Sequence, residues 1–220
     1  MNKFLILLAL ATSFSGALNA QKDPNALKIL DTMSEKYKKM DAFRANFTYE
    51  LFNETTDTKE SEKGQILVMG DKYKLTTGQL EKYNDGTTVW TYYQEFNEVN
   101  IENYMPGESE LSPSYIFNAY KKDFKFGTEA ELTFGARQVH VIRLEPENPD
   151  KFPIQFQWLK VFIDKADYTL WGWQTLDKTG NTYTISINGF DPFSGATDAM
   201  FRFDESKHPG VYISDLRDNK

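Results

Sequence analysis

The sequence predicts an α+β fold in which one large, curved antiparallel sheet, or half-barrel, has helices laid over its open side. Three observations predict it. Apolar and aromatic residues alternate along many short runs, such as 43–51, and alternation places one row of side chains on one face of a strand. Turn residues separate these runs, so neighbouring runs can pair as antiparallel strands. Helical periodicity is confined to two places, near the start and near the middle of the chain.

An amphipathic helix is expected first, over residues 24–40. Asp23 can cap it and Pro24 suits its first turn. Lysines and glutamate fall on the opposite side of this helix from its apolar residues. The apolar residues recur at helical spacing and would cover one face of a sheet: Leu27, Leu30, Met33, Tyr37 and Met40.

Strand-like runs make up most of the remaining chain. The strongest hairpin signal between them is Asp85-Gly86. The runs before the second helix are 43–52, 64–69, 73–77, 80–83, 88–96 and 98–104, separated by turns and a polar loop at 53–61. Ser112-Pro113 begins that helix, expected at 114–120. The later runs are 123–126, 131–134, 139–145, 156–164, 169–177, 181–190, 200–203 and 211–214.

The first 20 residues are typical of a secretory signal peptide. Lys3 provides a positive start, residues 4–11 are apolar, and small residues follow as far as Ala20. We expect cleavage after Ala20, which leaves one domain over residues 21–220. The alternative is an uncleaved anchor or a buried helix, but the apolar part is short for a membrane span.

Composition excludes several classes of protein. The chain has no cysteine, so it has no disulfides and no thiol for lipid modification. Its net charge of −7 argues against a nucleic-acid-binding protein. It has two histidines, His140 in an expected strand and His208 in an expected loop. No motif for a nucleophile, a phosphate loop or a zinc ligand set is present. We therefore expect no enzyme activity, no metal site and no cofactor.

The aromatic-rich face is either a packed core or the wall of a cavity. Aromatic residues make up 15% of the chain, with 17 Phe and 12 Tyr, and few helices are available to cover the sheet. Tyrosine suits a pocket edge because its ring is apolar and its hydroxyl tolerates water. A partly covered, curved sheet would offer a receptacle for acyl chains.

The expected cavity residues share one parity on each strand, and a slip of one residue would invert the assignment. They are Phe47, Tyr49, Leu51, Ile66, Val68, Tyr73, Leu75, Trp90, Tyr92, Val161 and Ile163. The two helices are expected to form a lid over this cavity. Its residues would be Leu30, Met33, Tyr37, Tyr115, Ile116 and Tyr120.

Three segments together resemble the periplasmic outer-membrane lipoprotein carrier proteins of the LolA family. They lie in the family's order and span most of residues 24–216. The first is similar to the family's junction of first helix and first strand, the second to its central hairpin, and the third to its C-terminal signature. They are Tyr37-Lys-Lys-Met-Asp-Ala-Phe-Arg-Ala-Asn-Phe-Thr48, Asn84-Asp-Gly-Thr-Thr-Val-Trp-Thr-Tyr92 with Glu98-Val99, and Gly195-Ala-Thr-Asp-Ala-Met-Phe-Arg-Phe203 with Pro209-Gly-Val211.

The resemblance implies an incomplete β-barrel with a helical lid over an apolar cavity that takes the lipid of acylated lipoproteins. Such a periplasmic carrier, expected as a monomer, receives cargo from an inner-membrane ATP-driven extractor. It delivers the cargo to the outer membrane, in some bacteria through a receptor. Two alternatives stay open: a carrier of another lipid or glycolipid, and a lipoprotein-sensing regulatory domain.

One departure from the family concerns the lid. Family members carry an arginine at the end of the second strand, and it binds lid backbone in the closed, empty form. The corresponding place here is Gly70-Asp71, which has no arginine. The resemblance therefore leaves open how the lid of this chain is held closed.

Overall fold

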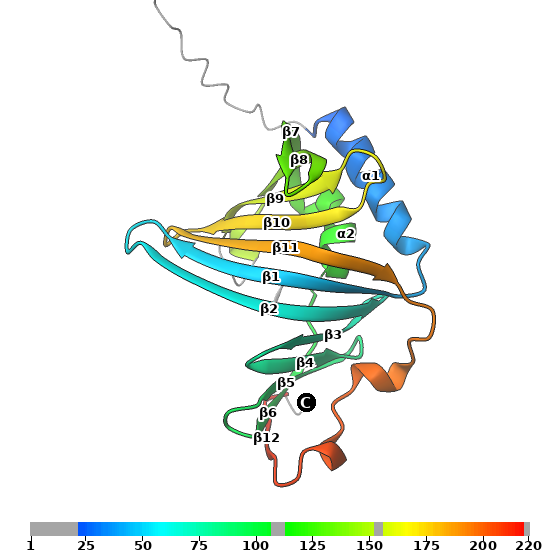
Figure 1. Cartoon of the computed structure of the whole chain (residues 1–220), viewed down its shortest axis with the longest axis vertical. Coiled ribbons are helices and arrows are strands. Elements are labelled where there is room, and N and C mark those ends of the chain that lie inside the picture. Colours follow the sequence, from blue (N-terminus) through cyan, green and yellow to red (C-terminus); the bar gives the residue numbers. More distant parts are fainter. Residues whose placement is uncertain (1–21, 107–112, 152–155, 218–220) are drawn as a thin grey trace, which may run out of the picture.

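The structure, a computed structural model, describes residues 22–106, 113–151 and 156–217. Within these ranges one strongly curved sheet of twelve strands carries two α-helices on its concave side (Figure 1). Its strand order is β12-β6-β5-β4-β3-β2-β1-β11-β10-β9-β8-β7, so β12 and β7 are the edges and the barrel stays open. The expected half-barrel with helices over its open side is confirmed.

Two meanders make up eleven strands of this sheet, and β1 and β11 join them at its centre. The first meander contains β1 (Phe43–Asn53), β2 (Thr58–Met69), β3 (Lys72–Thr77), β4 (Leu80–Asn84), β5 (Thr88–Tyr93) and β6 (Glu98–Asn103). The second contains β7 (Phe124–Phe134), β8 (Arg137–Pro146), β9 (Phe156–Asp164), β10 (Leu170–Asp177) and β11 (Asn181–Pro192). A 3-10 turn, η1 (Pro149–Lys151), lies between β8 and β9.

The alternation in β1 shows which of its side chains lie on the concave face of the sheet. Phe43, Ala45 and Phe47 are buried, whereas Arg44 and Asn46 between them are exposed. Residues opposite each other on paired strands share a face. The register of the paired strands therefore identifies the concave-face residues in the rest of the sheet.

Helix α1 (Pro24–Lys38) begins at the expected cap. The Asp23 carboxylate accepts the Asn25 N–H at 2.9 Å, and its other oxygen accepts the N–H and hydroxyl of Thr128 at 3.0 and 2.9 Å. The Thr128 bond is the main reason that the pKa of Asp23 lies below its usual value. These bonds cap the helix and also attach its start to β7.

The main core lies between the two helices and the β7–β10 half of the concave face. Leu30 and Met33 of α1, and Phe117 and Tyr120 of α2 (Pro113–Asp123), pack there. Their partners on the sheet are Phe124, Phe126, Ile142, Leu144, Phe156, Leu159, Val161, Ile163 and Leu170.

Two expected element boundaries were wrong. Strand β2 begins at Thr58, inside the expected polar loop, because Thr58–Ser61 pair with Glu50–Asn53 of β1 despite their polar side chains. The runs 123–126 and 131–134 form a single strand, β7, with a register shift between Thr128 and Ala130. A β-bulge of this kind bends a strand without ending it.

The C-terminal segment also differs from expectation. The run 200–203 is not a strand, because Asp198–Phe201 form a 3-10 helix, η2, followed by η3 (Glu205–Lys207). The final strand, β12 (Tyr212–Asp215), pairs with β6 in parallel rather than antiparallel. No helix in the described ranges is long and apolar enough to cross a membrane.

The turn between β10 and β11 is built around Asp177, a buried carboxylate. Its oxygens accept bonds from Thr179, from the Asn181 backbone and side chain, and from the Tyr183 hydroxyl, at 2.7–3.0 Å. Burial alone would raise the pKa of Asp177, but these hydrogen bonds outweigh it and hold the pKa at about 2. The ionised form is therefore stabilised by folding.

We predict that this carboxylate contributes about 2 kcal/mol to stability at neutral pH. The folded pKa is below the unfolded value of roughly 4, so the contribution is present above that value and is lost as the pH falls from about 4 to about 2. Denaturant unfolding of Asp177→Asn should show lower stability at pH 7 and a flatter acid dependence. Asp57→Asn, in an exposed turn, is the control; equal curves for Asp177→Asn and wild type would contradict the prediction.

Candidate functional site

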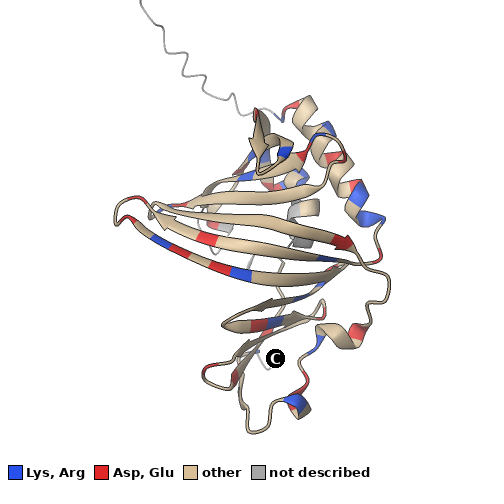
Figure 2. Ribbon diagram, in the orientation of Figure 1, with Lys and Arg blue, Asp and Glu red and all other residues tan. Residues whose placement is uncertain are grey.

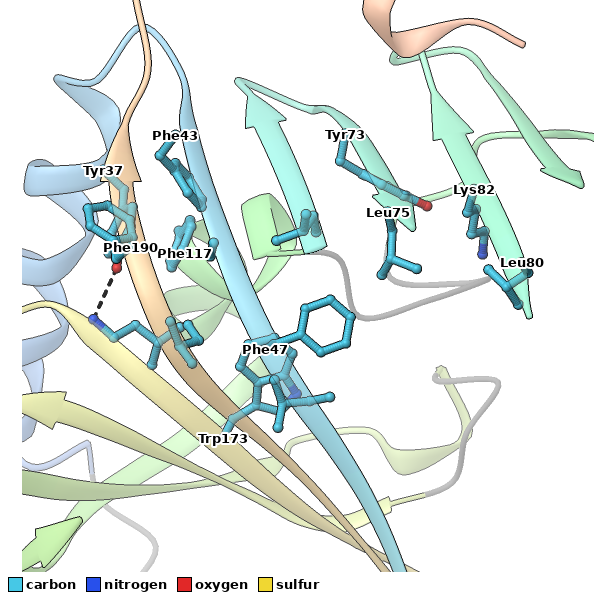
Figure 3. Close-up of a pocket in the computed structure, with 15 residues that line it drawn as sticks. Tyr37, Phe43, Phe47, Tyr73, Leu75, Leu80, Lys82, Phe117, Trp173 and Phe190 are labelled. Atoms are coloured by element: carbon cyan, nitrogen blue, oxygen red, sulfur yellow. Dashed lines mark hydrogen bonds between the residues drawn. The ribbon is translucent and has the colours of Figure 1, made fainter. Parts of the chain in front are cut away.

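An apolar cavity of about 310 Å³ lies on the concave face where the helical cover ends (Figure 3). Strands from both meanders and one residue of each helix form its walls. The lining residues are Tyr37, Phe43, Ala45, Phe47, Ile66, Tyr73, Leu75, Leu80, Lys82, Phe117, Leu170, Trp173, Ile185, Ile187 and Phe190.

The floor of the cavity is a row of small and aliphatic side chains across three strands. Ala45 on β1 is opposite Ile66 on β2, which in turn is opposite Leu75 on β3. Phe47 lies one step further along β1, and its ring lies over Gly64 on β2. A Cβ at Gly64 would be 2.3 Å from Phe47 Cζ, so the ring can take this position only because position 64 has no side chain.

The helical side of the cavity is an aromatic cluster. Tyr37 of α1 stacks on Phe117 of α2 with ring centroids 4.2 Å apart and planes 10° apart. Tyr37 also makes T-shaped contacts with Phe43 and Phe190 of the sheet, with ring centroids 5.2 and 5.7 Å apart. Such contacts add to the free energy gained from burial alone, so this cluster joins both helices to the centre of the sheet.

The Tyr37 hydroxyl also makes a buried polar contact. It accepts the backbone N–H of Leu170 at 3.0 Å, the dashed line in Figure 3. Burial raises the pKa of Tyr37, so its phenol stays protonated. The ammonium of the preceding residue, Lys36, donates to the Asp167 carbonyl at 2.9 Å and to its carboxylate at 3.0 Å. The C-terminal half of α1 is thus attached to the β9–β10 turn.

Contacts between the helices complete the cover. The Tyr120 hydroxyl of α2 donates to the Asp31 carboxylate of α1, and Lys121 Nζ lies 2.7 Å from Asp31 Oδ1. Burial would raise the pKa of Asp31, but the bonds from Lys121 and Tyr120 lower it. The two helices are therefore connected by polar groups as well as by the Tyr37–Phe117 stack.

The cavity walls offer little for covalent chemistry. Of the described residues that line it, Lys82 alone is charged. In the described part of the chain no group of three or more His, Cys, Asp and Glu is placed to hold a metal ion. A concave surface of aromatic and aliphatic side chains is suited to holding an apolar ligand.

Comparison with known proteins agrees with this geometry. The family model of the outer membrane lipoprotein carrier protein LolA matches residues 38–204. The chain belongs to the LolA family. No curated protein sequence matches the chain significantly.

Solved structures resemble this LolA-family chain at low sequence identity. An uncharacterized conserved protein from Thermus thermophilus has the same fold: it is 13% identical, with a TM-score of 0.57, over 87% of this chain and 99% of that one. A LolA superfamily protein from Nitrosomonas europaea is 11% identical, with a TM-score of 0.46, over 82% of this chain and 98% of that one.

The LolA-family resemblance implied a closing arginine near Gly70-Asp71, which this chain lacks. Both residues line a smaller cavity beside the C-terminal end of α1. The polar contacts described above hold this end of α1 through other residues, because Lys36 binds Asp167 and Tyr37 binds Leu170.

The structure brings five of the expected site residues together at the cavity. They are Phe47, Ile66, Tyr73, Leu75 and, from the expected lid, Tyr37.

Other expected residues lie on the concave face but do not line this cavity. Tyr49 and Leu51 continue the Phe47 row toward the end of β1, and Val68 lines the smaller cavity near α1. Val161 and Ile163 have no exposed surface, because the helices pack directly on them.

Three of the other expected lid residues also lie on the helices but do not line this cavity. Leu30 and Met33 are buried against the sheet, and Tyr120 binds Asp31. The side chains of Tyr115 and Ile116 lie outside the part of the chain that the structure describes.

Trp90 and Tyr92 lie on the opposite, convex face, so the parity expected for β5 was wrong. Trp90 is opposite Tyr83, and the Tyr92 ring lies 5.5 Å from Phe203 and 4.4 Å from His208 of the C-terminal segment. Bulky side chains occupy both faces of β5, so ring size did not identify the inner face. The cover on the outer face comes from residues more than a hundred positions later in the chain.

Sequence reasoning missed ten residues of the cavity. Most had a usable signal: Phe43 and Ala45 share the parity of Phe47, and Trp173 and the three residues of β11 belong to alternating runs. Lys82 gave no signal, because a charged side chain in a short strand usually faces water. The missed residues are Phe43, Ala45, Leu80, Lys82, Phe117, Leu170, Trp173, Ile185, Ile187 and Phe190.

We predict that Tyr37→Phe loosens α1 without unfolding the sheet. The substitution leaves the buried Leu170 N–H without its acceptor, at a cost of about 1–3 kcal/mol. Amide hydrogen exchange in α1 should become roughly tenfold faster or more, while exchange in β1 and β2 changes little. Tyr92→Phe, which removes a hydroxyl bonded to Asn97 on the outer face, is the matched control. Unchanged protection of α1 in Tyr37→Phe would show that this bond does not hold the helix.

Proposed function

We propose that this protein is a periplasmic carrier that holds the acyl chains of lipoproteins in the concave cavity and moves them from the inner to the outer membrane. The observation that carries the proposal is an apolar cavity of about 310 Å³, bounded by two helices, on the open face of a LolA-family half-barrel. Its role is binding rather than catalysis.

The physical task of such a carrier is to keep hydrocarbon away from water. Each CH₂ group gains about 0.8 kcal/mol on transfer to an apolar environment, so an acylated protein cannot cross an aqueous compartment unaided. The rings and aliphatic side chains around Phe47, Leu75 and Trp173 supply an environment of that kind.

Release of cargo is easier if the empty carrier can bury its apolar cavity surface against its own side chains. In this structure Phe117 and Tyr37 stack on each other, contact Phe43 and lie at the cavity wall. The cavity is at the lower end of the roughly 300–1,000 Å³ typical of ligand sites, so bulkier cargo would need these rings to move. Cargo would then compete with the aromatic cluster, which lowers its net affinity and permits transfer.

The proposed location and partners follow from the proposed function. The signal peptide over residues 1–20, which lies outside the described residues, would direct export. An inner-membrane ATP-driven extractor would load the carrier, and an outer-membrane receptor would be one route of delivery. We expect the carrier to act as a monomer.

Identification of the natural cargo tests the proposal directly. The protein would be purified from periplasm without detergent and analysed by native mass spectrometry. Peptides acylated at an N-terminal cysteine support a lipoprotein carrier. If free glycolipid or another lipid is the sole bound species, the cargo is that lipid and not lipoprotein.

We predict that Ile66→Glu strongly weakens the capture of acylated cargo. A carboxylate in the cavity floor would be desolvated by the acyl chains, and affinity for a fluorescent fatty-acid probe should fall roughly a hundredfold. Leu67→Glu is the matched control, because Leu67 is on the opposite face of β2 between Arg44 and Lys74, where a carboxylate is accommodated.

Photo-cross-linking to a lipoprotein in the periplasm should likewise decrease in Ile66→Glu and stay unchanged in Leu67→Glu. Folding of both variants would be checked by thermal unfolding. Normal capture by folded Ile66→Glu would exclude this cavity as the cargo site.

A further inference from the structure

Two buried oxygens on the concave wall have no hydrogen-bond partner among the described residues. They are Glu62 Oε1 and Asn100 Oδ1. Both atoms are acceptors, so a ligand or water that meets them must supply an N–H or O–H group. Unpaired buried acceptors are uncommon in native proteins, which makes their position relative to the cavity important.

Glu62 lies at the margin of the cavity. It is opposite Tyr49 on β1, and Tyr49 is opposite Ile185 on β11, which lines the cavity. On the other side of Glu62, a Cβ at Gly78 would lie 3.7 Å from Glu62 Oε1. Leu80, two residues beyond Gly78, also lines the cavity. An amphiphile with its chain in the cavity can therefore present its polar group to Glu62.

Asn100 lies on the same face at the other side of the cavity. The cross-strand row Leu75–Lys82–Thr91–Asn100 runs from the cavity floor across β4 and β5 to β6. The second unpaired oxygen is thus on the concave face two strands beyond Lys82, and it is again an acceptor.

Charges near Glu62 are divided between the two faces of the β1–β2 hairpin, where Figure 2 shows charged residues following one another along β2. Glu60, opposite Leu51, shares the concave face with Glu62. Lys59 and Lys63 have the other parity, and Lys59 binds Glu50 on the convex face at 2.8 Å. Carboxylates rather than ammonium groups therefore face the concave side of this hairpin.

The raised pKa of Tyr49 is consistent with a negative potential at this margin. Burial raises the pKa of Tyr49, and Tyr183, Glu60 and Glu62 raise it further. Lys82, the charged residue among the described residues that line the cavity, shares a row with Ile66. Ile66 is four residues, or roughly 13 Å, along β2 from Glu62.

We propose that Glu62 is a specificity-determining residue of the cavity. It favours amphiphiles whose polar group carries a hydrogen-bond donor or a positive charge, and it disfavours anionic head groups. The amide and peptide N–H groups next to the acyl chains of a lipoprotein belong to the favoured class, whereas anionic phospholipids, which share the same chains, belong to the disfavoured class. This inference rests on the proposed carrier function and adds to it a means of rejecting bulk membrane lipid.

The test compares head groups attached to identical acyl chains. Fluorescent diacyl probes with a phosphoglycerol head, a neutral diacylglycerol hydroxyl and a trimethylammonium head would be titrated into the full mature protein. Wild type should bind the neutral and cationic probes roughly tenfold more tightly than the anionic one. In Glu62→Gln this ratio should fall severalfold, mainly through tighter binding of the anionic probe.

Glu50→Gln is the matched control. It makes the same change in charge on the same hairpin but on the convex face, so it should leave the ratio unchanged. Circular dichroism and thermal unfolding would confirm that both variants fold.

Each outcome separates this inference from the carrier function itself. Equal binding of all three probes by wild type, a preference for the anionic probe, or an unchanged ratio in Glu62→Gln would overturn the role of Glu62 and leave acyl-chain binding intact. Failure of wild type to bind any of the probes would overturn both proposals.

Discussion

The structure depends on one constraint: two short helices cannot cover one face of a twelve-stranded sheet. At 1.5 Å per residue, the 15 residues of α1 span about 22 Å, whereas twelve strands spaced about 4.8 Å apart span roughly 50 Å. The helices cover the β7–β10 half, where Val161 and Ile163 are sealed from water. Curvature brings the other half of the sheet toward the helices but leaves the space between Tyr37 and Leu75 unfilled.

The same limit explains which features could be predicted from the sequence. Alternation identified the inner face of β1, and the local sequence identified the cap Asp23, since both are local properties. The inner face of β5 could not be predicted, because Trp90 and Tyr92 are covered by a segment distant in sequence. Likewise, the alternation of Val161 and Ile163 indicates the concave face but not whether a helix or an empty space lies above it.

Attachment of the first helix uses different chemistry from the arginine implied by the family resemblance. A neutral phenol, Tyr37, accepts one backbone N–H inside an aromatic cluster, and a partly exposed lysine, Lys36, binds the same turn. Exposed ion pairs contribute little to stability. Most of the attachment energy therefore comes from the burial of apolar side chains, among them Leu30, Met33 and Tyr37. An apolar ligand in the cavity can replace the part of it that Tyr37 contributes.

The parallel pairing of β12 with β6 has a consequence for the protein in a crowded compartment. An open barrel keeps two sheet edges, and an uncovered edge can recruit the edge of a neighbouring molecule. β12 covers β6 with only four residues, one of them Asp215, and a strand so short offers few backbone groups to a neighbour. The outermost position on the β6 side of the sheet is thus occupied by a poor template for self-association.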